Sequence, residues 1–215
     1  MKLVLLSLLI LLLWSCDSTQ EESIAESSKG SEIQLQKKSG EEKESFDAYL
    51  KNFKKVSLPI NIKACEPNIE DLITFDNKEF EAYRANKSFS PDAVIAFRQI
   101  PVNGNYVAVI SLGYADCLLP ILTTYRKNGV KIDEKTIAIG YCGSDCGYSC
   151  EEFMTLQNDF SIYTSDTVTS SDCDSLGNIV PGTTEKYVIY RKGRLLSNGK
   201  IELSNEIKEL LSVKH

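Results

Sequence analysis

The sequence predicts an α+β fold, made mainly of one strongly twisted antiparallel β-sheet meander with N-terminal helices and a short C-terminal helix. Beyond Pro91, short runs of apolar and β-branched residues alternate with tight-turn dipeptides such as Asn103-Gly104, Asn128-Gly129 and Asn198-Gly199. Sequential strands joined by tight turns pair antiparallel in a meander. Near both ends of the body, apolar residues instead recur at helical spacing.

Residues 1–15 have the form of a secretory signal peptide. A basic start, Met1-Lys2, precedes an apolar run from Leu3 to Trp14, and the small residue Ser15 follows. The run is too short to persist comfortably as a membrane-spanning helix. We therefore expect these residues to be removed during export.

The residues Leu13-Trp14-Ser15-Cys16 resemble the lipobox of bacterial lipoproteins. The resemblance implies that signal peptidase II cuts before Cys16, and that Cys16 carries a diacylglyceryl thioether and an amide-linked acyl chain such as palmitate. Several acyl chains anchor a protein stably, whereas one chain is marginal. The alternative is an ordinary secretory signal in which this cysteine has no such role.

Residues 16–43 predict a disordered tether. They are rich in Ser, Glu, Lys and Gln, and their few aliphatic residues cannot offset the cost of ordering. Asp17 bears on sorting, because Asp after the lipidated cysteine favours the inner membrane in enterobacteria-like lipoproteins, whereas acidic residues there accompany surface export in Bacteroidota-like ones. We expect a lipid-anchored location in the cell envelope, with the outer membrane favoured over the inner membrane.

The charge balance argues against nucleic acid as a partner. Loss of Lys2 with the leader leaves 23 basic against 30 acidic residues, a formal charge of −7. Such a surface repels polyanions. We expect the chain to contact the membrane through its lipid anchor and to take an envelope protein or a glycan as partner.

Residues 44–215 are expected to form a single α+β domain. Apolar residues at helical spacing predict three helices, and Pro59 predicts an extended segment. The helices are expected over Glu44 to Val56, Lys78 to Ala85 and Glu206 to Val213, the last capped by Ser204 or Asn205, and the extended segment over Ser57 to Ala64. Strands are expected over Ala93 to Pro101, Tyr106 to Gly113, Phe153 to Gln157, Phe160 to Val168 and Thr184 to Lys192, and from Leu195 onward.

A long β-hairpin is expected from Asp116 to Tyr141. A type I′ turn at Asn128-Gly129 would pair Lys127 with Val130. One extra residue near Asp133 to Lys135 is then needed to keep the apolar residues on one face. With that bulge, the expected facing pairs are Ile121 with Ile137, Leu119 with Ile139 and Cys117 with Tyr141.

The layout of Leu122 to Asp133, Leu156 to Tyr163 and Glu185 to Leu195 resembles small uncharacterised envelope lipoproteins of Bacteroidota-type bacteria. The resemblance covers about half of the body and rests on turns and strands. It implies anchoring and a fold, and no activity.

Six cysteines remain when Cys16 is set aside, and an even number in an exported body predicts disulfides. The expected register brings Cys117 close to Cys142 and brings Cys173 toward Cys146 or Cys150. We expect at least two bridges that hold the loop from Gly140 to Glu151. The disulfide candidates are Cys65, Cys117, Cys142, Cys146, Cys150 and Cys173.

The alternative is a thiol-dependent metal-binding or redox lipoprotein that uses Cys142, Cys146, Cys150 and Cys173. Their spacing differs from that of zinc ribbons and ferredoxins, and no Cys-x-x-Cys redox motif is present. Export also favours disulfides. We therefore expect no metal and no cofactor.

The residue inventory favours a non-catalytic binding or structural module over an enzyme. The only histidine is His215, at the C-terminus, and no Gly-rich phosphate loop is present. A hydrolase that uses paired carboxylates is a further alternative. The expected ligand-contact loop carries Tyr141, Ser144, Asp145 and Tyr148, since rigid aromatic side chains lose little entropy on binding; the tyrosines could equally cover the end of the sheet.

Cys16→Ser is expected to abolish acylation, because the thiol is the atom that takes the lipid. Intact-mass analysis of the protein from membrane fractions measures this directly. Cys173→Ser is the matched control and should leave acylation intact. An unchanged acylated mass in the Cys16→Ser variant would contradict lipidation.

Overall fold

The computed structural model describes residues 44–63, 80, 82–83, 94–143 and 145–213. The expected leader and tether, most of the expected helix from Lys78 to Ala85, and the candidates Cys65 and Ser144 lie outside the described residues. Within the described part, no helix has the length and apolar character needed to cross a membrane.

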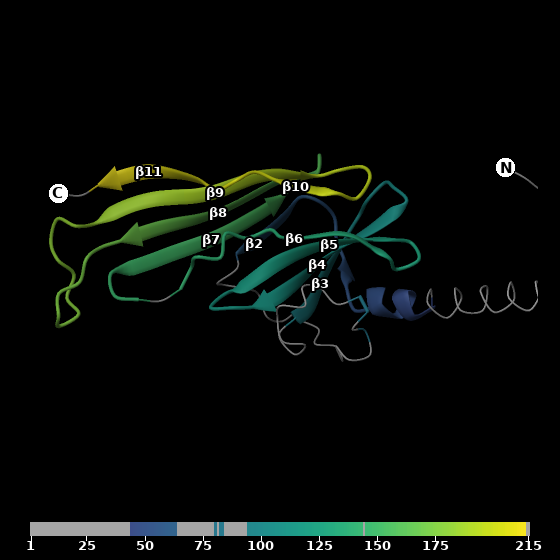
Figure 1. Cartoon of the computed structure of the whole chain (residues 1–215), viewed down its shortest axis with the longest axis horizontal. Coiled ribbons are helices and arrows are strands. Elements are labelled where there is room, and N and C mark those ends of the chain that lie inside the picture. The colour runs from purple at the N-terminus through teal and green to yellow at the C-terminus, as the bar shows by residue number, and fades with distance from the viewer. Residues whose placement is uncertain (1–43, 64–79, 81, 84–93, 144, 214–215) are drawn as a thin grey trace, which may run out of the picture. The chain divides into compact units, whose positions relative to one another are not determined.

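The described strands form two sheets (Figure 1). The first, sheet A, has the order β1-β3-β4-β5-β6, and the second, sheet B, has the order β10-β9-β8-β7-β2, with β11 also paired to β9. All pairings are antiparallel except that of β1 with β3. The strands are β1 Lys54–Lys55, β2 Ile60–Lys63, β3 Val94–Ile100, β4 Tyr106–Tyr114, β5 Leu118–Arg126, β6 Lys131–Thr136, β7 Tyr148–Leu156, β8 Ser161–Ser170, β9 Glu185–Leu195, β10 Ile201–Leu203 and β11 Ile207–Val213.

The two sheets share one hydrophobic core. Ile110 and Leu122 of sheet A belong to the same buried cluster as Ile62, Met154 and Leu156 of sheet B. Alternate residues of a strand point to opposite faces, so each sheet contributes every second residue to this core. The sheets therefore pack face to face, as in a β-sandwich.

The only described helix, over residues 44–50, covers the other face of sheet A. Its Phe46 and Tyr49 are buried against Tyr125 of β5, with ring centroids 5.2 Å and 6.0 Å from that ring. The Tyr125 hydroxyl donates to the carbonyl oxygen of Tyr83. Burial raises the pKa of Tyr49 to about 12, so these hydroxyls stay neutral.

The connection between β9 and β10 closes one end of the core. Asp133 of β6 accepts a hydrogen bond from Ile201 N at 3.0 Å, and Thr124 Oγ1 donates to Gly199 O at 2.7 Å. These contacts join the edge of sheet A to the edge of sheet B near the start of β6. Farther along β6 the two edges separate.

The predicted α+β class, with N-terminal helices and a single meander, is wrong. The described chain is mostly strand, in two sheets, with one short helix. The helix expected from Glu44 to Val56 ends at residue 50, because a turn follows and β1 then pairs with β3. The aromatic residues that predicted it nevertheless pack on sheet A.

The predicted C-terminal helix from Glu206 to Val213 is also wrong, because Ile207–Val213 forms strand β11 against β9. The 11 residues of β9 are more than the 3 residues of β10 can pair. Unpaired backbone groups along that edge favour an additional strand. Tertiary pairing thus outweighs the helical spacing of the apolar residues.

The predicted turn of the central hairpin needs correction. Arg126 N donates to Val130 O at 2.7 Å, and Gly129 N donates to Arg126 O at 2.9 Å. Gly129 has a φ of 86°, which glycine adopts without strain. The loop therefore has three residues, 127–129, and Lys127 does not pair with Val130.

The bulge of this hairpin lies at Ile132, just before the expected position. Tyr125 pairs with Lys131 and Thr124 with Asp133, which leaves Ile132 without a partner in the ladder. Ile121 then lies opposite Thr136 instead of Ile137. Because β6 ends at Thr136, the expected ladder pairs beyond it, Leu119 with Ile139 and Cys117 with Tyr141, do not form.

Ile110→Ala is expected to lower the free energy of unfolding by about 2–5 kcal/mol, because it leaves a cavity in the core shared by both sheets. Ile110 is 0% exposed, whereas Leu176, the matched control, is 85% exposed. Leu176→Ala should change stability by less than about 0.5 kcal/mol. Urea unfolding with the disulfides intact checks both values, and equal effects would argue against this core.

Candidate functional site

The segment over residues 137–142 leaves sheet A after β6 and lies against sheet B. Its first residues, Ile137, Ala138 and Ile139, are buried. The next two amides are held by carboxylates of sheet B: Gly140 N donates to Glu152 Oε1 at 3.0 Å, and Tyr141 N donates to Asp166 Oδ2 at 2.9 Å. The two carboxylates therefore accept backbone hydrogen bonds that a neighbouring strand would otherwise accept, and they position this segment.

Glu152 and Asp166 face each other in the ladder between β7 and β8 and are 3% and 0% exposed. Burial, followed by repulsion from Asp166, raises the pKa of Glu152 from 4.5 to about 7. Burial, with a smaller contribution from Glu206, raises the pKa of Asp166 from 3.8 to about 6. Glu152 Oε2 and Asp166 Oδ1 have no hydrogen-bond partner within the described chain. The pair therefore favours carrying a proton near neutral pH.

Two disulfides hold the loop that follows, which confirms the prediction of at least two bridges there. Cys142 pairs with Cys150, with their Cα atoms 5.2 Å apart, and Cys146 pairs with Cys173 at 6.3 Å. The four cysteines of the alternative metal site are thus joined in two disulfides. Cys117 is disulfide-bonded as well, but not to Cys142 as the expected register indicated, because Cys142 is bonded to Cys150. The Cys117 Sγ lies 3.9 Å from the carbonyl oxygen of Cys142.

Gly147 allows the second bridge to form. It has a φ of 64°, and a Cβ there would lie 2.4 Å from the carbonyl oxygen of Ser171. Ser171 N donates to Gly147 O at 2.9 Å. Only glycine lets the turn approach so closely, and this approach brings Cys146 to Cys173.

The first disulfide lies beside the buried carboxylates. A carboxylate oxygen of Asp166 and the Sγ atoms of Cys142 and Cys150 all lie within 4.8 Å of one another. Cys142 is buried and Cys150 is half-buried. A recess of about 270 Å³ lies on the opposite face of the same strands, where Glu151, Phe153, Ser165 and Thr167 are joined by Lys63 of β2.

The expected ligand-contact loop is only partly exposed to solvent. Tyr141 is 53% exposed, and its hydroxyl donates to Glu206 Oε2 at 2.9 Å. The Tyr148 hydroxyl donates to the carbonyl oxygen of Tyr141 at 2.9 Å. Asp145 accepts a hydrogen bond from Cys146 N at 2.7 Å and so stabilises its own turn.

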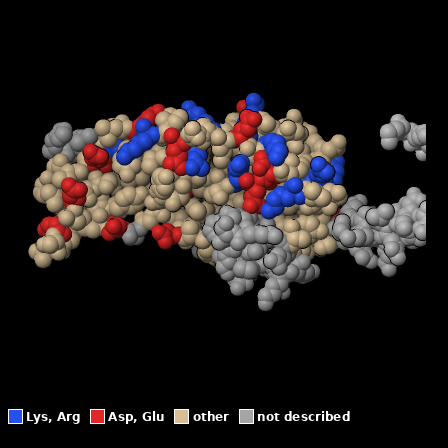
Figure 2. All heavy atoms as spheres, in the orientation of Figure 1, with Lys and Arg blue, Asp and Glu red and all other residues tan. Residues whose placement is uncertain are grey.

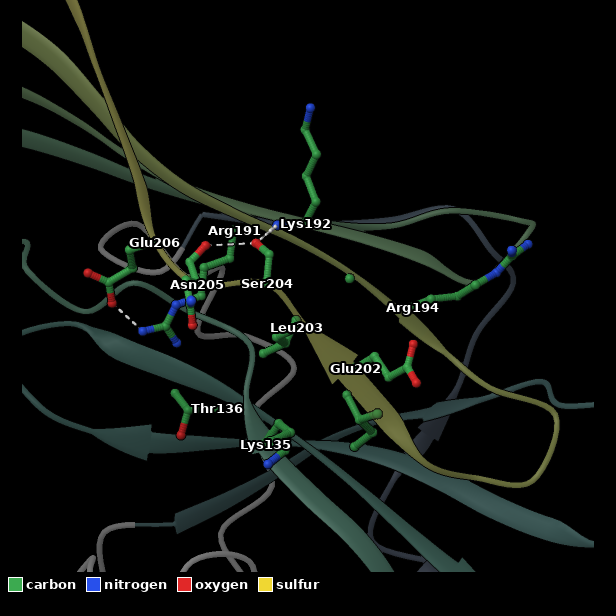
Figure 3. A pocket seen from close by; sticks show the side chains of 12 residues that line it. Lys135, Thr136, Arg191, Lys192, Arg194, Glu202, Leu203, Ser204, Asn205 and Glu206 are labelled. Carbon is green, nitrogen blue, oxygen red and sulfur yellow. Dashed lines mark hydrogen bonds and ion pairs between the residues drawn. The ribbon is translucent and has the colours of Figure 1, made fainter.

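An open groove of about 1060 Å³ lies where the two sheet edges separate, between β6 on one side and β9 and β10 on the other (Figure 3). Arg191 forms an ion pair with Glu206, the same residue that binds the Tyr141 hydroxyl. Lys192 extends away from the groove (Figure 3). The lining residues are Lys135, Thr136, Arg191, Lys192, Gly193, Arg194, Ile201, Glu202, Leu203, Ser204, Asn205 and Glu206.

The groove carries charges of both signs, and Lys135 has no ion pair within the described chain. Figure 2 shows basic and acidic side chains interspersed over one face, without a large patch of either sign. Strong attraction of a polyanion is therefore not expected there. The groove instead offers hydrogen-bond donors and acceptors next to one exposed aromatic ring.

Comparison with known proteins returns no matching family model, no similar curated protein and no similar solved structure.

Sequence reasoning missed Glu152, Asp166 and the groove. A signal was present for Glu152, because strand alternation puts it on the same face as Met154 and Leu156, both apolar. An acidic residue at an inward position of a strand indicates either a buried partner or a functional site. The groove had no such signal, since it depends on how two sheet edges separate.

The protein is expected to be more stable at pH 5 than at pH 8. The folded-state pKa values of Glu152 and Asp166 are raised to about 7 and about 6. The protonated pair therefore contributes stability that is fully present below about pH 4 and is lost as the pH rises through 6 to 7. One pKa unit corresponds to about 1.4 kcal/mol, and the two acids titrate as a coupled pair, so we expect a difference on the order of 1–3 kcal/mol.

Thermal unfolding at the two pH values measures this difference, and a variant with both Glu152→Gln and Asp166→Asn is the control. Amide oxygens can still accept the two backbone hydrogen bonds, but they do not titrate. The variant should lose most of the pH dependence. A wild-type profile that is flat or rises between pH 5 and pH 8 would show that these acids are not buried as described.

Proposed function

We propose that this chain is a lipid-anchored, non-catalytic binding module of the bacterial cell envelope, and that it binds an oligosaccharide in the groove between β6 and β9–β10. The signal peptide and the lipobox-like Cys16 support the anchor and the location. The disulfides support an oxidising compartment. The groove supports the binding role, because it is a hollow of about 1060 Å³ that lies on strand edges.

The residues that line the groove favour an oligosaccharide as its ligand. Sugar hydroxyl groups need donors and acceptors close together, and Arg191, Asn205 and Glu206 supply both kinds. The groove is open and largely polar, which fits an extended polar chain better than a compact apolar molecule. Its mixed charges do not favour a polyanion.

Tyr141 supplies the apolar contact at the end of the groove. Its ring is held by the hydrogen bond from its hydroxyl to Glu206, which itself pairs with Arg191. A fixed aromatic ring offers contact area to the C–H face of a sugar at little entropic cost. The expected contact loop and the groove therefore form one surface, joined at Glu206.

Tyr141→Ala is expected to weaken oligosaccharide binding by about tenfold or more, because it removes both the ring and the support of Glu206. Calorimetric titration of the full-length protein in detergent, with neutral oligosaccharides derived from envelope and plant polysaccharides, measures this. Tyr114, 48% exposed on β4 of the other sheet, is the matched control. Tyr114→Ala should bind as the wild type does.

Arg191→Ala should weaken binding to a similar extent, since Glu206 then loses its ion pair. Two outcomes would contradict the proposal. One is a lack of saturable binding by any of these oligosaccharides at millimolar concentration. The other is binding that Tyr141→Ala and Tyr114→Ala leave equally unchanged.

A further inference from the structure

We propose that the Cys142–Cys150 disulfide undergoes exchange with external dithiols, and that Asp166 is the residue that transfers the proton. The sequence has no Cys-x-x-Cys motif, but the fold places the two sulfurs and an Asp166 oxygen within 4.8 Å of one another. This activity is separate from oligosaccharide binding, because it uses neither the groove nor the exposed ring of Tyr141.

The two described bridges differ in a way that singles out this one. Cys146–Cys173 joins an exposed residue to a half-buried one and closes a surface turn. No acid lies within the same short distance of both its sulfurs in the part of the chain that is described. Cys142–Cys150 instead lies beside the buried Asp166. Cys142 is buried and Cys150 is half-buried, so Cys150 is the sulfur that an external thiol reaches first.

The acids cost stability that a structural role does not require. Two backbone amides could be held equally well by Asn or Gln side chains, which carry no charge. Burying two carboxyl groups next to each other is unfavourable. In addition, Glu152 Oε2 and Asp166 Oδ1 have no hydrogen-bond partner within the described residues. A carboxyl group beside a disulfide, as Asp166 is here, is suited to giving and taking a proton.

The exchange step follows from the exposure of the two sulfurs. A thiolate of the external dithiol attacks Cys150 Sγ, the bond between the sulfurs of Cys150 and Cys142 breaks, and Cys142 leaves with the electron pair. Protonated Asp166 gives its proton to the Cys142 thiolate and becomes a carboxylate. The second thiolate of the dithiol then attacks the mixed disulfide and releases Cys150 as a thiolate, which takes a proton from water. The dithiol is oxidised to a disulfide, and the protein bridge is reduced by two electrons.

Several charged and titratable groups surround Asp166 and set its protonation. Glu206 opposes the ionisation of Asp166 and is itself paired with Arg191. Tyr187 carries Lys208 over its ring, with Nζ 3.7 Å from the centroid. The groups that face this region are Glu152 of β7, Tyr141 and Tyr148 of the bridged loop, Tyr187 and Arg191 of β9, Glu206 before β11 and Lys208 of β11.

Reduction of the two bridges can be followed separately in one molecule. The full-length protein in detergent is treated with dithiothreitol at pH 5 and at pH 8, free thiols are trapped with a maleimide, and mass spectrometry locates them. Each rate constant is divided by the concentration of dithiothreitol thiolate. For Cys142–Cys150 this normalised constant should be about tenfold larger at pH 5, where Asp166 is protonated. For Cys146–Cys173 it should not change.

Asp166→Asn is the decisive variant, because Asn can still accept the Tyr141 amide but has no acidic proton. It should remove the pH response of Cys142–Cys150 while leaving circular dichroism and the Cys146–Cys173 rate unchanged. If this variant fails to fold, Glu206→Gln serves instead. It keeps Asp166 and should shift the response to lower pH, because the repulsion of Asp166 by Glu206 is removed.

Three results would overturn the proposal. The normalised rate of Cys142–Cys150 could be the same at both pH values. Asp166→Asn could keep the wild-type response. Finally, both bridges could resist dithiothreitol until the protein unfolds, which would make them structural only.

Discussion

The structure depends on how the chain crosses from sheet A to sheet B after β6. The amide of Ile137 still donates to Pro120 O of β5, but the amides of Gly140 and Tyr141 have no strand of sheet A beside them. Glu152 and Asp166 accept the hydrogen bonds of Gly140 and Tyr141 instead. Two buried acids are a costly solution, and the chain tolerates it because both stay partly protonated. This constraint determines where the following residues lie.

The segment that the two acids hold carries the residues to which we assign functions. Tyr141 reaches Glu206 at the end of the groove, and Cys142 follows Tyr141 and pairs with Cys150 beside Asp166. This segment thus supplies the exposed ring of Tyr141 at the end of the polar groove and the sulfur of Cys142 in the disulfide beside Asp166. The proposed oligosaccharide site and the proposed exchange site are chemically independent, although the same backbone segment positions both.

The strands could be predicted from the sequence, but their assembly could not. Alternating apolar residues and Asn-Gly turns indicated most strands, and the even number of cysteines indicated the bridges. The division into two sheets depends on β6 ending at Thr136, which alternation alone does not specify, since Ile137 and Ile139 continue the apolar pattern. Ile207–Val213 has helical spacing, yet the length of β9 makes it a strand. The role of Asp166 could not be predicted, because it depends on contacts with residues that are distant in the sequence.

Amide chemical shifts of Gly140 and Tyr141, followed by NMR from pH 4 to pH 8 in the full-length protein, test the central claim most directly. An amide that donates to a carboxylate reports the titration of that carboxylate. The Gly140 proton should shift with a midpoint near 7 and the Tyr141 proton with a midpoint near 6, the pKa values of Glu152 and Asp166. Amide protons that show no transition in this range, or that exchange with water as fast as those of an exposed loop, would contradict the account.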